Sequence, residues 1–296
     1  MILVVGSTGF LGSEICRRLT SQGKAVRGLV RSTSNPERVA ALKGWGVETV
    51  LGDLRDPDSL AKACRGVETV ITTATTTVSM QPGDSIPVTD QQGQLDLVKA
   101  ASSRGVKNFI FISYSKNIDA GMTPCPLTVA KRAVEQAVID SGMVYTILRP
   151  SDFMEVWLSP AIGFDYPNAK ATIYGEGHAR ISFISLGDVA QFAVESLENI
   201  AARNQILELG GPAALSPLEV VRIFEKVSGK SFELQFIPAA ALKAQKEGAT
   251  DPLQKSFASL MLSQSNGNEV DMSLAKKVFS FPLTSVDDYA HRVLGK

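Results

Sequence analysis

Ile2-Leu3-Val4-Val5-Gly6-Ser7-Thr8-Gly9-Phe10-Leu11-Gly12 contains the pattern from which the fold can be predicted. Its first four residues predict a buried strand, and Leu11, Ile15 and Leu19 then recur at the spacing of an amphipathic helix. The glycines follow a G-x-x-G-x-x-G spacing: the first two allow a tight turn and close backbone approach, and the third lets helix and strand pack closely. Such a turn presents unpaired N–H groups and the positive end of a helix dipole to an anion. We therefore predict a pyrophosphate-binding turn of a dinucleotide site; the alternative is a purely structural turn.

Strand-like and helical segments alternate through the first half of the chain. The strand-like segments are residues 2–5, 25–30, 48–51, 67–72, 108–113 and 144–148. The helical segments lie near residues 12–22, 36–43, 58–64, 90–103 and 127–141. This alternation predicts an α/β fold, a doubly wound Rossmann-type parallel sheet with helices on both faces. Right-handed crossovers place the carboxyl ends of the strands along one edge, where ligands bind.

The second half changes character after Pro150. We predict short apolar segments and loops at 160–176, a helix at 186–198, strands at 206–209 and 232–237, and a polar, alanine-rich helical stretch at 239–268. Ser216-Pro217-Leu218-Glu219 is a helix start with serine as N-cap and glutamate three residues later. We expect an NAD(P)-binding domain at residues 1–155 and a smaller α/β substrate lobe at residues 156–296. The lobe does not fold independently, and some of its segments can return to the first sheet; whether 239–268 forms a lid is left open.

Composition and charge narrow the classes of function. Lys+Arg and Asp+Glu both total 30, so the net charge is zero, which argues against nucleic acid as the main partner. The three cysteines are far apart and there are two histidines, so neither a disulfide framework nor a metal site is supported. No apolar run reaches the roughly 18 residues of a membrane span, and no basic leader precedes the first strand. We expect a cytoplasmic monomer or homodimer.

Residues after three further strands are candidates for the cofactor site. Arg31 ends the second strand, where NAD-preferring sites usually carry an acidic residue. A cation at this place suits a 2′-phosphate and favours NADPH. The alternative is that Arg31 is a solvated loop arginine. Asp53 can accept a hydrogen bond from the adenine amino group, with Leu54 over the ring; otherwise Asp53 forms an Asx turn or a helix N-cap. Ala74 and Thr75 follow the fourth strand, where small residues let the backbone approach the adenosine ribose.

Five segments carry a family resemblance. They are G-S-T-G-F-L-G (6–12), L-V-R-S (29–32), G-V-E-T-V-L-G-D-L-R-D-P-D-S-L (46–60), F-I-F-I-S (109–113) and Y-T-I-L-R-P-S-D-F-M-E (145–155). With Lys131 and Glu135, they resemble the atypical short-chain dehydrogenase/reductase family in its NmrA-like branch, which includes isoflavone-type, quinone and triphenylmethane-type reductases. The resemblance runs to about residue 237. It implies an NADPH (NADP+)-dependent oxidoreductase that passes a hydride to a carbonyl, quinone or activated double bond of a small, largely apolar substrate.

The resemblance also implies the site residues. The cofactor-binding set is Gly6, Ser7, Thr8, Gly9, Phe10, Leu11, Gly12, Arg31, Asp53, Leu54, Ala74, Thr75, Ser113, Lys131, Pro150 and Phe153. Lys131 would orient the cofactor ribose and assist proton transfer, while Leu127 occupies the place of the superfamily's proton-donating tyrosine. Glu135 lies one helical turn after Lys131, so a surface ion pair is the alternative.

The ends of the fifth and sixth strands complete the expected catalytic site. Ser113 occupies the place of the superfamily's substrate-orienting serine. Tyr114 is the first candidate for a proton donor other than Lys131, although an aromatic at a strand end is often packing. By resemblance, the backbone at Pro150 borders the nicotinamide and Phe153 walls the substrate pocket. The aromatic residues beyond suit a flat hydrophobic substrate, and they suit a core equally well.

A rival function comes from a different class: a non-catalytic NAD(P)-binding regulator or assembly factor, which the same branch includes. Leu127 in the tyrosine place favours this reading, whereas Lys131 and the apolar residues after the sixth strand count against it. A third possibility, a sugar-nucleotide epimerase, shares the fold. Such enzymes carry the full Tyr-x-x-x-Lys pattern, which this sequence lacks. The substrate and the direction of the reaction stay open.

Overall fold

A computed structural model of the chain describes residues 1–77, 81–120 and 125–296. Two compact units interleave along the sequence. The first unit contains Met1–Ser113, Pro126–Leu148 and Ala190–Leu207. The second unit contains Tyr114–Cys125, Arg149–Val189 and Glu208–Lys296.

A seven-stranded sheet in the order β3-β2-β1-β4-β5-β6-β9 forms the centre of the first unit. Its strands are β1 (Ile2–Val5), β2 (Val26–Val30), β3 (Glu48–Leu51), β4 (Thr69–Thr72), β5 (Asn108–Ile112), β6 (Val144–Pro150) and β9 (Gln205–Leu209). All neighbouring strands from β3 to β6 pair in parallel. The strand order reverses between β1 and β4, the kind of switch point at which open α/β sheets bind ligands. The predicted doubly wound fold is confirmed.

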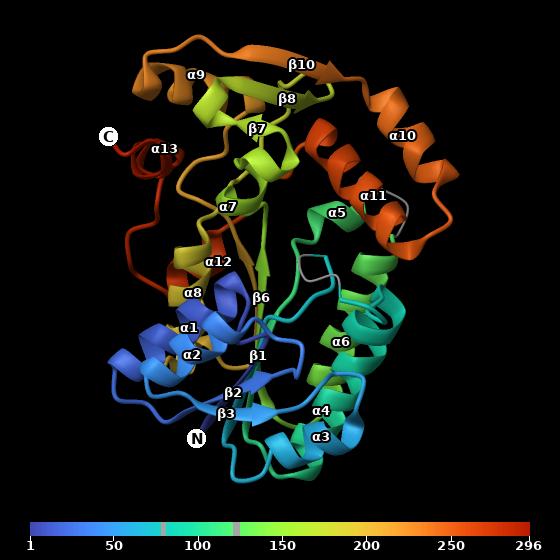
Figure 1. Cartoon of the computed structure of the whole chain (residues 1–296), viewed down its shortest axis with the longest axis vertical. Helices are drawn as coiled ribbons and strands as arrows, with labels where there is room; N and C mark the ends of the chain where they lie inside the picture. Colours follow the sequence, from blue (N-terminus) through green and yellow to red (C-terminus); the bar gives the residue numbers. More distant parts are fainter. Residues whose placement is uncertain (78–80, 121–124) are drawn as a thin grey trace. The chain divides into compact units, whose positions relative to one another are not determined.

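Helices cover both faces of this sheet (Figure 1). One side carries α1 (Phe10–Ser21), α2 (Pro36–Gly44) and α8 (Leu186–Glu195), and the other carries α3 (Pro57–Ala63), α4 (Gln94–Ser103) and α6 (Pro126–Asp140). A short 3-10 helix, Ile200–Ala202, precedes β9. Phe109 and Phe111 of β5 share one buried cluster with Leu97 of α4 and Val134 of α6. Apolar periodicity in the sequence therefore becomes the sheet–helix core, because each helix buries one face against the strands.

The helix predicted at 90–103 begins earlier and in a different form. A π-helical segment, Ile86–Gly93, leads directly into α4. Its start is marked by Ser85, whose hydroxyl oxygen accepts a hydrogen bond from the Val88 N–H at 3.3 Å, and by a proline in the first turn. The 3.6-residue periodicity used for the prediction does not detect a π-helix, because its side chains repeat at a longer interval.

The second unit contains a three-stranded sheet in the order β10-β8-β7. β8 (Lys170–Tyr174) pairs in parallel with β10 (Glu233–Ile237) and antiparallel with β7 (Phe164–Asp165). The helices are α5 (Asn117–Ala120), α7 (Met154–Trp157), α9 (Pro217–Ser228), α10 (Ala239–Gly248), α11 (Pro252–Asn266), α12 (Ser273–Val278) and α13 (Val286–Leu294), with 3-10 turns at Pro160–Ile162 and Tyr166–Asn168. Residues 160–176, predicted as short segments and loops, thus contribute two strands. The stretch 239–268 divides into two helices, and Asp251 is the N-cap of the second, with its side chain accepting from the Gln254 N–H.

Aromatic side chains form the core of the second unit. Phe164 packs against Phe224 of α9 with ring centres 4.8 Å apart, and Phe232 and Tyr289 join the same cluster. The aromatic residues beyond the sixth strand suited either a substrate pocket or a core, and Phe164 belongs to the core. The predicted start of α9 is confirmed: Ser216 and Glu219 form a reciprocal capping box.

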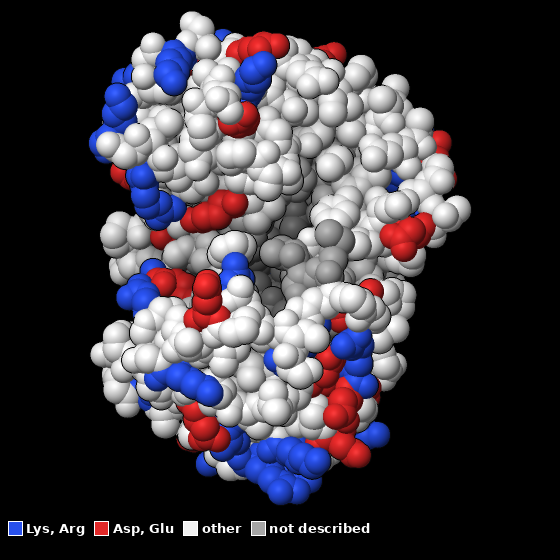
Figure 2. Space-filling view, viewed as in Figure 1, with Lys and Arg blue, Asp and Glu red and all other residues white. Residues whose placement is uncertain are grey.

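The surface carries charged side chains of both signs. On the face shown in Figure 2, basic and acidic side chains are interspersed, as their equal totals lead one to expect. Within the described ranges, no helix is long and apolar enough to cross a membrane. The same residues contain no group of three or more His, Cys, Asp or Glu side chains arranged to hold a metal ion.

Candidate functional site

The glycine-rich turn joins β1 to α1, and close contacts require its glycines. Gly6 has φ +84°, and a Cβ there would lie 2.6 Å from Thr73 Oγ1. A Cβ on Gly12 would lie 2.1 Å from the carbonyl oxygen of Gly6. Gly9 is the N-cap of α1, and its N–H donates to the Gly6 carbonyl at 2.9 Å. A larger residue at Gly6 or Gly12 would force the turn open.

The first turn of α1 leaves backbone N–H groups without an intrahelical acceptor. In the part of the chain that the structure describes, no side chain caps this helix. The N–H groups of Phe10, Leu11 and Gly12 precede the first intrahelical hydrogen bond, so they are available to an anion at the positive end of the dipole. The Ser7 hydroxyl is used elsewhere, because it is buried and donates to the Leu29 carbonyl at 2.7 Å. Only the Ser7 backbone is therefore left for a ligand. This arrangement fits a pyrophosphate.

Two arginines follow β2, in different environments. Arg31 Nη1 lies 2.8 Å from Asp84 Oδ2, and the Asp84 side chain is almost wholly buried. Arg38 of α2 donates to the Thr8 carbonyl at 2.9 Å, and its guanidinium lies 4.9 Å from the centre of the Phe10 ring. Arg38 therefore contacts the glycine-rich turn, whereas Arg31 is held by a carboxylate. The sequence pattern indicated Arg31 alone; the signal for Arg38 was its place in the first turn of the helix after β2.

The residues expected to contact the adenosine make contacts with other residues of the first unit. Asp53 Oδ1 accepts a hydrogen bond from the Arg55 N–H at 2.9 Å, which is the Asx turn left open as the alternative. The Arg55 guanidinium lies 2.7 Å from Asp53, and its hydrogen bonds hold the pKa of that carboxyl below its usual value. Leu54 is buried in the core cluster, and Ala74 packs against it. Thr75 is half-buried after β4.

Lys131 lies buried on α6 beneath the end of β5. Its Nζ donates to the Ile112 carbonyl at 3.1 Å and lies 5.0 Å from the centre of the Phe111 ring. Burial lowers the pKa of Lys131, while the nearby charges of Asp90 and Glu135 act to raise it. Because Lys131 and Glu135 are both buried, the surface ion pair considered as an alternative does not describe them.

Ser113 follows β5 and belongs to a buried polar group. Its hydroxyl donates to Glu135 and accepts from Arg132 Nη1 at 3.2 Å. Arg132 Nη1 also lies 2.7 Å from Glu135 Oε1. Leu127 is buried on α6 and supplies no proton donor at the tyrosine place.

Asp90 was missed by the sequence analysis. It lies in the π-helical segment, 1% exposed, and its Oδ2 accepts hydrogen bonds from the backbone and side chain of Thr76. Among the described residues, Asp90 Oδ1 has no hydrogen-bond partner. A buried carboxylate oxygen without a donor is costly. A ligand hydroxyl would satisfy it, and the charge of the same carboxylate acts on Lys131.

Tyr114, Pro150 and Phe153 belong to the second unit. The Tyr114 hydroxyl donates to Asp152 Oδ1 at 2.8 Å, and burial together with the Asp152 charge raises the pKa of Tyr114 well above its usual value. The Pro150 carbonyl accepts from the Ser115 N–H at 3.0 Å. Phe153 is half-buried and forms a bridge with Ile184.

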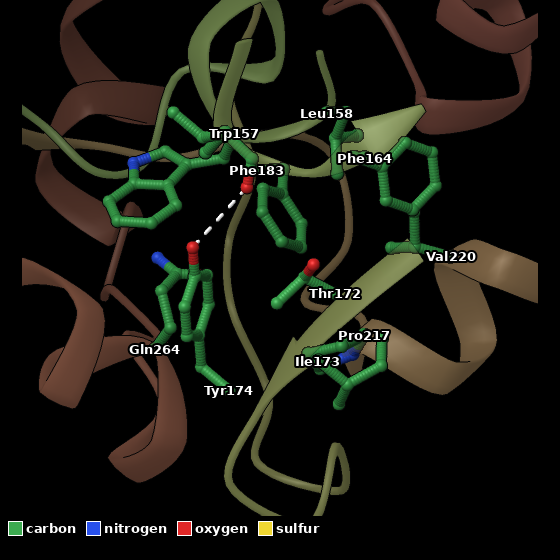
Figure 3. A pocket seen from close by; sticks show the side chains of 11 residues that line it. Trp157, Leu158, Phe164, Thr172, Ile173, Tyr174, Phe183, Pro217, Val220 and Gln264 are labelled. Atoms are coloured by element: carbon green, nitrogen blue, oxygen red, sulfur yellow. Dashed lines mark hydrogen bonds between the residues drawn. The ribbon is translucent and has the colours of Figure 1, made fainter. Parts of the chain in front are cut away.

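A small aromatic pocket lies within the second unit (Figure 3). Its lining residues are Trp157, Leu158, Ile162, Phe164, Thr172, Ile173, Tyr174, Phe183, Pro217, Val220 and Gln264. Trp157 and Tyr174 meet edge to face at 6.3 Å, and the Tyr174 hydroxyl donates to the Ile162 carbonyl (Figure 3). The cavity measures about 30 Å³, whereas a cavity that holds benzene measures about 150 Å³. The pocket is therefore much smaller than a cavity that encloses an aromatic ring.

Comparison with known proteins places these features in a family context. Residues 1–290 match the model of the NmrA-like family. The photosystem II assembly factor Ycf39 of Trieres chinensis is 28% identical over 97% of this chain and 91% of its own length. The isoflavone reductase homolog IRL of Zea mays is 30% identical over 99% and 98%. The NADPH-dependent quinone oxidoreductase QOR2 of Escherichia coli, solved with NADPH, is 24% identical, with a TM-score of 0.79 over 99% of this chain and 100% of that one.

Proposed function

This chain belongs to the NmrA-like family, and on that premise we propose that it is an NADPH-dependent reductase. Its substrate is a small, largely apolar molecule with a carbonyl, quinone or activated double bond. The observation that carries the proposal is the uncapped first turn of α1, behind a turn that admits no side chain at Gly6 or Gly12. The names of the maize relative and of the Escherichia coli structure support a reductase.

The 2′-phosphate that distinguishes NADPH from NADH needs cationic partners. Arg38 already contacts the glycine-rich turn, and Arg31 follows the second strand. We assign both guanidinium groups to the phosphate, because planar donors suit its oxygens. Asp84 holds Arg31 in place and partly neutralises it, which leaves Arg38 as the stronger contributor.

Lys131 and Asp90 would hold the nicotinamide ribose. The ammonium of Lys131, which donates to the Ile112 carbonyl, would donate to a ribose hydroxyl, and Asp90 Oδ1, without a partner among the described residues, would accept from one. Ser113, fixed by Glu135 and Arg132, orients the substrate at the end of β5. When bound, NADPH supplies the hydride, and the protein contributes binding, orientation and a proton.

The proton has two candidate sources on this chain. Lys131 has a pKa lowered by burial, which makes it readier to release a proton. Tyr114 has a raised pKa, so its hydroxyl stays protonated at neutral pH and can act only as an acid. Either group would serve in place of the tyrosine that Leu127 replaces.

Binding and turnover can be tested separately. NADPH and NADH are titrated against the protein by fluorescence, and quinones, enones and ketones are then screened for loss of NADPH absorbance. We expect NADPH to bind more tightly than NADH and at least one acceptor to be reduced. Failure of NADPH to bind would overturn the proposal.

One observation favours a second function, a non-catalytic NADPH-binding assembly factor. Leu127 is buried and aliphatic where the superfamily places its acid, and the Trieres chinensis relative is named as an assembly factor. This function predicts NADPH binding with no oxidation by any acceptor. The same two assays therefore separate the two functions.

A further inference from the structure

A buried carboxyl group lies against Tyr114 in the second unit. The Tyr114 hydroxyl donates to Asp152 Oδ1, and Asn268 Nδ2 donates to Asp152 Oδ2, both at 2.8 Å. Asn268 is held in turn by the Ser115 hydroxyl, which donates to its Oδ1 at 3.1 Å. Asp152 and Asn268 are both fully buried. Segments distant in sequence thus enclose one carboxyl group.

In the described part of the chain, the neighbours of this carboxyl group are uncharged. The groups that face Asp152 are the Tyr114 phenol and the amides of Asn268 and Gln264, and Cys125 lies near the phenol. Among the described residues, no lysine, arginine or histidine forms an ion pair with Asp152. A buried carboxylate without a counter-ion is costly, and groups of this kind concentrate at functional sites.

The connectivity puts the pair at the ends of two strands. β5 ends at Ile112 and β6 at Pro150, and Tyr114 and Asp152 each follow shortly after. These two strands are parallel neighbours, so their carboxyl ends share the edge of the sheet at which such folds bind ligands. The position suits a group that serves the reaction better than one that only stabilises a core.

We propose that Asp152 is a positioning residue for Tyr114: it fixes the phenol and returns a proton to it after each turnover. This inference rests on the proposed reductase function and selects Tyr114 over Lys131 as the proton source. Asn268 is assigned the task of holding the second carboxyl oxygen, so that the first faces the phenol.

The proton steps balance as follows. After the substrate has received the hydride, it carries an extra electron pair on oxygen or carbon. The O–H bond of Tyr114 breaks, and a new O–H or C–H bond forms on the substrate. The proton on the Asp152 carboxyl group then moves to the phenol oxygen, and the carboxylate is reprotonated from water. One substrate, one NADPH and one proton give one product and one NADP+.

The relay works only while Asp152 carries a proton. Burial raises the pKa of Asp152 to about 6, against hydrogen bonds from Asn268 and Tyr114 that lower it. The rate of reduction should therefore be high below about pH 6 and fall as the pH rises through that value. If Lys131 were the proton donor, the rate would fall at a different pH, because other charged groups, Asp90 and Glu135, act on its pKa.

Three variants test the relay: Tyr114→Phe, Asp152→Asn and the double variant. Each single change should lower kcat about 100-fold, with the NADPH dissociation constant unchanged. The double variant should lose no more than either single one, because the two residues act as a unit. Asp152→Asn should also abolish the fall in rate near pH 6. Asp188→Asn is the matched control: its carboxylate is also buried in the second unit and held by Thr284, and it should keep the pH profile.

A readout independent of turnover is the carbon-13 NMR titration of labelled aspartate carboxyl groups. We expect one resonance to titrate near pH 6, to vanish in Asp152→Asn and to move to higher pH in Tyr114→Phe, which removes one donor. If Asp152→Asn does not fold, Tyr114→Phe and this titration still test the inference.

The outcomes separate the two proposals. If the wild type reduces an acceptor but Asp152→Asn keeps the pH profile, or the losses add, the relay is wrong and the reductase stands. If the wild type binds NADPH and reduces nothing, the reductase function fails and the relay falls with it.

Discussion

The substitution Gly12→Ala tests the glycine-rich turn most sharply. The added Cβ would lie 2.1 Å from the Gly6 carbonyl oxygen, whereas ordinary contact begins at 3.4 Å. The helix must therefore move by about 1.3 Å, the difference between these two distances. Such overpacking costs roughly 1–3 kcal/mol. It also moves the first-turn N–H groups out of reach of a phosphate.

The effect on affinity follows from the hydrogen bonds lost. Each charge-assisted hydrogen bond contributes roughly 1.5–3 kcal/mol, so losing two weakens binding by about 100-fold or more. The assay is a fluorescence titration of NADPH, with urea unfolding recorded alongside to show that the variant is folded. Gly44→Ala is the matched control, since a Cβ there meets nothing within 4 Å. We expect Gly44→Ala to bind normally and to be slightly more stable. A folded Gly12→Ala with wild-type NADPH affinity would refute the reasoning.

Three further predictions concern charged groups. Arg38→Ala and Arg31→Asp should each weaken NADPH about tenfold or more with little change for NADH, measured by titration of both cofactors; equal weakening of the two would refute the phosphate assignment. Lys131→Ala should lower turnover and weaken NADPH binding, because it removes the ribose contact; steady-state kinetics that match the wild type would remove Lys131 from the site. The pKa of Asp152 in the folded protein, about 6, exceeds its value in the unfolded chain. Its contribution to stability, roughly 3 kcal/mol, is therefore fully present below about pH 4 and is lost as the pH rises through 6. Urea unfolding across this range should show the slope in the wild type and not in Asp152→Asn; identical slopes would count against the raised pKa.

Much of the fold was predictable because its signals are local. Strand β1 coincides with the apolar run at residues 2–5, strand β3 has the bounds predicted for it, and the capping box at Ser216 marks the start of α9. Strands β7 and β8 escaped prediction: β7 has only two residues and no pattern of its own, and the five-residue β8 forms by pairing with β7 and β10. The π-helical segment before α4 escaped for the different reason that its period is not that of an α-helix.

In the candidate site too, local features could be predicted from the sequence and long-range contacts could not. The glycine-rich turn could be identified from seven consecutive residues, since its function depends on backbone conformation. The partners of Arg31, Lys131 and Tyr114 could not, because each lies on another segment: Asp84 is 53 residues from Arg31, and Asp152 is 38 residues from Tyr114. Asn268 lies 116 residues from Asp152. Single-sequence patterns carry no information about such long-range pairs.

The most direct test of the central claim is the fate of the hydride. The protein is incubated with NADPH carrying deuterium at both C4 positions and with an enone or ketone that it reduces, and the product is analysed by mass spectrometry. The account predicts one deuterium on carbon in each product molecule. Product without deuterium, or NADPH binding with no product from any acceptor, would contradict it.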